Sequence, residues 1–282
     1  IVFSQTDDLQ SAFDALPQTR STAQTVVDLS NFSALERTRP LYIRNGGNFK
    51  VINGTLSRAA ELKDSAVVAI TGGSTVQLAD GVTISGGGTY TGHELVLVEN
   101  GTLTVEGATF CDMYVDNSNS PIRPIMTNND NSIRLQQLES ASSTLYFNSG
   151  SIIVGRLGVT TVRGIENEGG QMYLNGGDIP YVSTDCDFII NGKVKLDKLI
   201  LGLNKKMIVT SAIENPISIT LPSIPETRLS ITEAQPPTGN FDGYVVATGS
   251  DKYTLAQSDI DNITLNVDAE LWELRLEDNK AV

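Results

Sequence analysis

The sequence predicts an all-β protein whose short strands wind as a solenoid, and three observations lead to this prediction. Short β-prone runs fill most of the 282 residues and are separated by clusters of Gly, Asn, Asp and Ser. Helical periodicity is confined to one segment near the N-terminus. An apolar–x–Asn–Gly–x–apolar frame occurs at Gly54, Gly101 and Gly192, with a looser relative at Gly150, and Gly54, Gly101 and Gly150 lie 47 and 49 residues apart. This spacing fits two coils of roughly 20–25 residues each, as in a β-solenoid, with a β-sandwich or double-sheet fold as the alternative.

The first predicted element is a short amphipathic helix over residues 6–16. Thr6 supplies an N-cap, two acidic residues follow it, and apolar residues recur at helical spacing until Pro17 ends the pattern. A single short helix has little stability of its own in water and gains it from packing. We therefore expect Leu9, Phe13 and Leu16 to be buried.

The predicted strands follow the helix. Each is a run of β-branched, aromatic or other apolar residues that alternates with polar residues or is bounded by turn-forming residues. The runs are 25–29, 41–43, 49–56, 67–70, 76–78, 82–84, 95–98, 103–105, 133–135, 144–147, 152–154, 172–174, 188–190, 193–196 and 207–210.

The composition changes near Glu214, where prolines become frequent. This change predicts a boundary between a solenoid over residues 1–213 and a C-terminal β cap or small β subdomain over residues 214–282. Trp272, Leu274 and Leu276 fall on one strand face at a period of two, so we expect them to pack on the last coils.

An N-terminal helix, the strand around Val26–Leu29 and short strands punctuated by Gly and Asn together resemble the right-handed parallel β-helix, or pectin-lyase-like, superfamily. The C-terminal stretch from Gly243 to Val282 is similar to the ends of surface β-helix proteins of gut Bacteroidetes. The resemblance implies that the helix 6–16 caps the first coil. It covers the fold and does not supply a function.

Composition and charge exclude several classes of partner. The chain has 33 acidic and 20 basic residues, a formal net charge of −13, and lacks the basic face that nucleic-acid binding needs. Its apolar runs are far shorter than the roughly 20 residues of a transmembrane helix. The chain begins at Ile1, which suggests a mature form whose targeting segment was removed. Two cysteines, Cys111 and Cys186, are expected to remain free thiols.

Candidate catalytic groups are few. The lone histidine, His93, has no nucleophile motif near it, and one His with two Cys excludes a metal site built from several such ligands. Asp185 and Asp187 flank Cys186, so on a strand they would share one face roughly 6.5–7 Å apart, a separation open to an inverting acid/base pair. A solvated pair of carboxylates without a catalytic role is the alternative. No catalytic residue is carried over from the superfamily, whose glycosidase motifs occur in a different order.

The polar segment 112–131 interrupts the strand rhythm, and long excursions of this kind often bind ligands. Tyr114 and Arg123 offer the stacking and hydrogen-bonding groups that a sugar uses. The oxygen side chains are also calcium ligands in type, although no calcium-binding motif is present, so no cofactor is assigned. The residues expected to contact a ligand are Asp112, Tyr114, Asp116, Arg123 and Asp130.

These observations favour a non-catalytic, exported bacterial protein at the cell surface that presents an adhesin-like surface to a glycan or a protein partner. A polysaccharide lyase or glycoside hydrolase of the pectin-lyase-like superfamily is the alternative. The binding protein and the enzyme are distinguished by whether the protein cleaves a polysaccharide that it binds. The oligomeric state is left open by the sequence.

Overall fold

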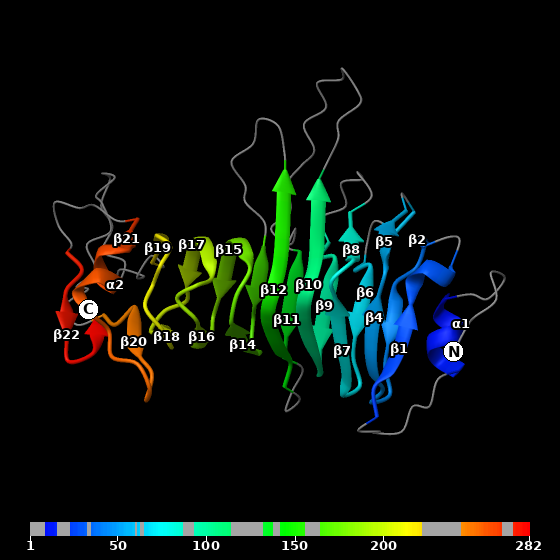
Figure 1. Cartoon of the computed structure of the whole chain (residues 1–282), viewed down its shortest axis with the longest axis horizontal. Helices are drawn as coiled ribbons and strands as arrows, with labels where there is room; N and C mark the ends of the chain where they lie inside the picture. The colour runs from blue at the N-terminus through cyan, green and yellow to red at the C-terminus, as the bar shows by residue number, and fades with distance from the viewer. Residues whose placement is uncertain are drawn as a thin grey trace, which may run out of the picture.

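The computed structural model describes residues 9–15, 23–32, 35–59, 61–62, 65–86, 93–113, 132–137, 142–155, 164–221, 244–266 and 273–282. Within these ranges the chain is mostly β-strand with two α-helices, which confirms the prediction of an all-β fold. The strands follow one another along the long axis of the molecule, from α1 (Leu9–Ala15) at one end to β22 (Leu276–Glu277) at the other (Figure 1).

The strands form three rows of parallel pairs, here called rows A, B and C, within one hydrogen-bonded sheet. Row A consists of β1 (Thr25–Asp28), β4 (Asn48–Ile52), β7 (Ser74–Ala79), the first halves of β10 (Gly101–Met113) and β12 (Thr144–Gly155), β14 (Gln171–Leu174), β16 (Phe188–Ile190), β18 (Met207–Val209) and β20 (Ala247–Gly249).

Row B consists of β2 (Glu36–Arg37), β5 (Gly54–Arg58), β8 (Val82–Ser85), the second halves of β10 and β12, and the starts of β15 (Asp178–Thr184) and β17 (Lys195–Leu201). Row C consists of β3 (Leu41–Ile43), β6 (Val68–Ile70), β9 (Val96–Glu99), β11 (Ile133–Gln136), β13 (Ile165–Asn167), the ends of β15 and β17, β19 (Ile217–Thr220) and β21 (Ile263–Leu265).

Up to β17 the chain visits the rows in the order A, B, C, and we call one such passage a circuit. Among the described strands, every pairing is parallel except those of β23 (Lys280–Ala281) with β20 and β22. Most of the described strands therefore pair in parallel. Parallel pairing also crosses residue 213, since β18 pairs with β20 and β19 with β21.

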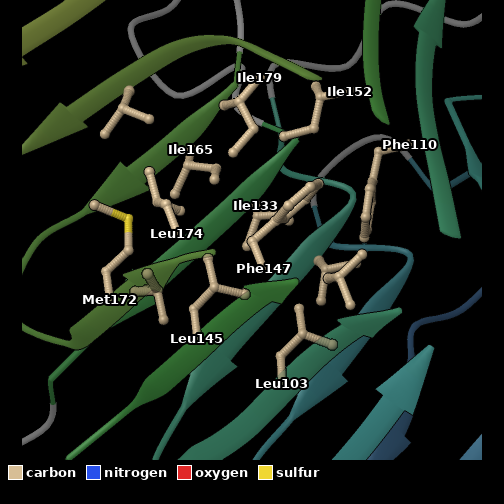
Figure 2. Packing of buried hydrophobic residues seen from close by; sticks show 14 of the residues in the cluster. Leu103, Phe110, Ile133, Leu145, Phe147, Ile152, Ile165, Met172, Leu174 and Ile179 are labelled. Atoms are coloured by element: carbon tan, nitrogen blue, oxygen red, sulfur yellow. The ribbon is translucent and has the colours of Figure 1, made fainter. Parts of the chain in front are cut away.

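One continuous hydrophobic core runs between the rows. Alternate residues of each strand point inward and stack on the equivalent residue of the next circuit. In row A, Leu103 lies opposite Leu145, and Leu145 lies opposite Met172, all at most 2% exposed. Figure 2 shows these side chains with Phe147, Leu174 and their neighbours from the other rows filling the interior.

The Asn-Gly repeat does not mark equivalent positions, so it does not define the length of a circuit. Gly54 begins a row B strand, whereas Gly101 begins a row A strand. Asn53 and Asn100 both have left-handed φ angles, 52° and 56°. The Asn-Gly pair therefore encodes a local turn conformation that the chain uses at different corners, rather than a place in the circuit.

Helix α1 covers the end of the rows at the first circuit. Leu9 and Phe13 are 3% and 2% exposed, which confirms their predicted burial, whereas Leu16 lies outside the described residues. The Phe13 ring meets Phe49 edge-on at 5.3 Å between centroids. The Gln10 side chain donates to the Tyr42 carbonyl at 2.9 Å and accepts from the Tyr42 N–H at 2.8 Å. The Gln10 amide thus supplies the two hydrogen bonds that a preceding strand would give to β3, because it presents the same donor and acceptor as a peptide group.

The other end is closed by an antiparallel hairpin and a short helix. Asp278 and Asn279 have positive φ angles of 43° and 64°, which suits the two-residue turn between β22 and β23. Leu274 and Leu276 pack against the core as expected, whereas Trp272 lies outside the described residues. The two free cysteines, Cys111 and Cys186, are both partly buried.

A buried carboxylate within α2 (Gln257–Asp261) joins this end to the preceding circuit. Asp259 is 1% exposed and accepts hydrogen bonds from the Tyr253 hydroxyl at 2.7 Å, the Ala256 N–H at 2.7 Å and the Ile213 N–H at 2.8 Å. Burial, the hydrogen bond to Asp259 and the charge of Asp259 raise the pKa of Tyr253 to about 12.

We expect the C-terminal end to lose stability at alkaline pH through Tyr253. Its folded pKa lies above the ordinary tyrosine value of about 10, so its contribution is complete below about pH 10 and is lost as the pH rises through 12. Chemical denaturation at a series of pH values should show an alkaline loss of stability that is smaller in Tyr253→Phe. An identical pH dependence in the two proteins would contradict this role.

Candidate functional site

The two candidate catalytic carboxylates do not lie on a strand. Asp185 and Asp187 fall in the bend between β15 and β16, so the separation inferred from a shared strand face does not apply. Asp187 accepts the Lys206 N–H at 3.0 Å and pairs with the Lys206 ammonium at 3.3 Å. Burial raises the pKa of Cys186 between them. Asp187 is therefore engaged in holding the turn before β18.

Of the five residues expected to contact a ligand, the structure places only Asp112, whose backbone lies opposite Val154 in the paired ends of β10 and β12. The other four, Tyr114, Asp116, Arg123 and Asp130, lie outside the described residues. The described ends of β10 and β12 extend beyond the neighbouring strands (Figure 1).

The most regular array of outward side chains lies on row A. Five successive strands, β4, β7, β10, β12 and β14, each contribute two residues in register. Because the residue between each pair points into the core, the pair itself faces outward. We call these ten residues the row A face: Asn48, Lys50, Thr75, Gln77, Thr102, Thr104, Thr144, Tyr146, Gln171 and Tyr173.

The row A face carries hydroxyl, amide and phenol groups, with Lys50 as its one charged residue. Tyr146 and Tyr173 lie opposite each other, and their rings stack at 4.7 Å between centroids with 16° between planes. The Tyr173 hydroxyl is 3.5 Å from Gln171 Oε1. Leu145, Phe147, Met172 and Leu174, which alternate with the tyrosines along β12 and β14, point into the core (Figure 2). Tyr146 and Tyr173 therefore point away from the core.

Acidic residues stand at the turns along both sides of the row A face. Asp80 and Glu106 follow β7 and the first half of β10, and Glu99 and Glu168 precede β10 and β14. Glu106 accepts a hydrogen bond from Asn148, whose own side-chain oxygen accepts one from Asn175 at 2.7 Å. A polar, nearly uncharged sheet face is thus bordered by negative charge.

Arg134 of row C forms an ion-pair network that includes Glu168, one of the acidic residues beside the row A face. Arg134 donates to both oxygens of Glu168 at 2.8 and 2.9 Å and lies 3.6 Å from Glu166. Burial alone lowers the pKa of Arg134, but the hydrogen bond to Glu168 and the charges of Glu168, Glu166 and Glu94 outweigh it and raise the pKa. Since the guanidinium is already engaged by these carboxylates, we assign it to holding β11 and β13 together.

In the part of the chain that the structure describes, no group of three or more His, Cys, Asp and Glu side chains could hold a metal ion. The described helices also include none long and apolar enough to cross a membrane.

Comparison with known proteins leaves the chain without an assigned family. No family model, curated protein or solved structure matches it. The class that the fold defines is an all-β protein built on parallel strands, and its function must be argued from its own surface.

Sequence reasoning did not find the row A face, although the signal is present. The segments Asn48–Val51, Thr75–Leu78, Thr102–Val105, Thr144–Phe147 and Gln171–Leu174 share a polar–apolar–polar–apolar pattern, or the same pattern with Tyr at the third position. The Asn-Gly pairs indicate turns at the corners and carry no information about the strand faces. Aligning these four-residue segments would have placed Tyr146 beside Tyr173.

Proposed function

We propose that the three rows wind as a right-handed parallel β-helix, and that the protein is an exported, non-catalytic, adhesin-like protein of the bacterial cell surface that binds glycan through the row A face. The ordered succession of rows A, B and C supports the β-helix. The binding proposal depends on one observation: five strands in register present hydroxyl, amide and phenol groups around the Tyr146–Tyr173 pair.

The groups of the row A face suit a sugar ligand. Hydroxyls and amides donate and accept hydrogen bonds in the same way as sugar hydroxyls, and tyrosine adds an apolar ring with a polar tip. The rings of Tyr146 and Tyr173 cover each other on one side, so the ligand is offered their edges, hydroxyls and outer faces.

We expect Tyr146→Ala to weaken glycan binding by about tenfold or more, since each 1.4 kcal/mol of lost contact energy is about tenfold in affinity. The measurement is a glycan array followed by titration of the best ligand. Tyr42→Ala is the matched control, because Tyr42 is 42% exposed on β3 in row C. Equal binding by Tyr146→Ala and wild type would reject the row A face as the site.

The same polysaccharides should be incubated with the protein and assayed for new reducing ends and unsaturated products. Binding without either product is the expected result. Release of products would replace the binding role with that of a lyase or glycoside hydrolase. A protein ligand that binds through the row A face, with no glycan bound, would replace the glycan as partner.

A further inference from the structure

We infer that the ligand of the row A face is a neutral, extended polysaccharide that lies along the row, across the strands. This inference rests on the function proposed above and adds to it the charge of the ligand, its direction and the length that it must span. Three features of the face lead to it.

The first feature is the distribution of charge. Lys50 is the only charged residue of the row A face, while Asp80, Glu99, Glu106 and Glu168 border it on both sides. The chain as a whole carries a formal charge of −13. A polyanion on this face would meet the carboxylates of Asp80, Glu99 and Glu106, and like charges repel one another within about 10 Å at 0.1 M salt. Glu168 contributes less to this repulsion, because Arg134 pairs with it. An acidic glycan is therefore disfavoured, and a neutral one meets no such penalty.

The second feature is the chemistry of the outward groups. Thr102, Thr104, Thr144 and Gln171 offer uncharged donors and acceptors, and Tyr146 and Tyr173 add two phenols. A neutral sugar exchanges its hydrogen bonds to water for bonds to these groups without any charge losing its hydration. We therefore expect the affinity to depend little on salt.

The third feature is the repeat. Each of the five strands contributes the same two outward positions, and adjacent strands are about 4.8 Å apart. Contacts therefore recur along the row over about 19 Å, from β4 to β14. A polymer aligned with the row meets a new pair of side chains at every strand, whereas one aligned with a single strand meets only one pair.

The test titrates the intact chain with three series of linear oligosaccharides, from disaccharide to octasaccharide. One series is neutral β-linked glucose, one is an acidic uronate and one is a cationic, deacetylated chitin oligomer. We expect the neutral series to bind, with affinity that rises with length until the face is spanned and changes less than about threefold between low and physiological salt. Stronger binding of the uronate or the cationic series, with strong salt dependence, would overturn the inference.

Variants at separate strands test the direction. Gln77→Ala on β7 and Tyr173→Ala on β14 should each lower the affinity for the longest oligomer by about fivefold to tenfold. The two variants should not both lower the affinity for the disaccharide, because a disaccharide is too short to reach both strands. Thr83→Ala on row B, in register with Thr55 and Thr109, is the control and should bind as wild type.

The outcomes separate the two proposals. If none of the three series binds, and the array is also negative, the glycan-binding function itself fails. If a neutral glycan binds but its affinity is independent of length, or if only one of the two variants affects the longest oligomer, the function stands and the alignment along the row is wrong.

Discussion

Replacing Arg58 with Ala is expected to lower the free energy of unfolding by about 3–5 kcal/mol. Arg58 ends β5 and is 1% exposed, and each of its two terminal nitrogens donates two hydrogen bonds. Its guanidinium donates to the carbonyls of Leu62 at 2.7 Å, His93 at 3.0 Å and Glu94 at 2.8 Å, and to that of Ser65. Two of these carbonyls belong to the corner after β5, and two to the same corner one circuit later.

The expected cost comes from the acceptors that Arg58→Ala leaves behind. A buried carbonyl without a donor costs about 1–3 kcal/mol, and the bonds to Leu62 and Glu94 are buried. Arg58→Lys should recover part of the loss, because an ammonium has three donors but cannot span four carbonyls as a planar guanidinium does.

The measurement is equilibrium denaturation of Arg58→Ala, Arg58→Lys and a matched control, Arg275→Ala. Arg275 pairs with Glu273 at 3.0 Å, but its side chain is 68% exposed, so its removal should change stability by less than about 1 kcal/mol. If Arg58→Ala and Arg275→Ala have the same midpoint of denaturation, Arg58 does not brace the corners.

Phe13→Ala is expected to lower the free energy of unfolding by about 3 kcal/mol, the range for a buried aromatic side chain. The Phe13 ring is 2% exposed and packs edge-on against Phe49, which is itself 2% exposed in β4. Losing this contact should release α1 and with it the Gln10 amide from Tyr42. The backbone edge of β3 would then be open to pairing with another molecule.

Denaturation midpoints and sedimentation of Phe13→Ala should be compared with those of Val26→Ala, a substitution of a 47% exposed side chain in the same circuit. Val26→Ala should change stability by less than about 0.5 kcal/mol and leave the association state unaltered. Gln10→Ala should promote association with a smaller loss of stability, since it removes the edge-capping amide but keeps the apolar contacts. An unchanged midpoint and association state in Phe13→Ala would show that α1 is not a cap.

The geometry of the candidate site could not be predicted from the sequence. The sequence predicts that Asp185 and Asp187 share a strand face, but the chain bends there and Lys206 pairs with Asp187. Tyr146 and Tyr173 belong to separate strands, and nothing in either strand alone indicates that the two rings stack. Their proximity depends on which strand follows which in row A.

Local interactions were readable from the sequence. Alternating apolar residues determined the all-β class and the inward faces of the strands, and helical spacing determined that Leu9 and Phe13 would be buried. Turn-forming Asn and Gly marked where strands end, because their backbone preferences are local. These features depend on residues close together in the chain.

The register between circuits was decided only by the tertiary structure. Parallel strands pair through backbone groups that almost every residue has, so a segment does not specify its partner. The spacing is also irregular: Leu103 pairs with Leu145, whereas Tyr173 pairs with Ile189 much sooner along the chain. Connections of different length between the rows remove the fixed period. The contacts that depend on register, Gln10 with Tyr42, Arg58 with two corners and Tyr146 with Tyr173, therefore appear only when the circuits are stacked.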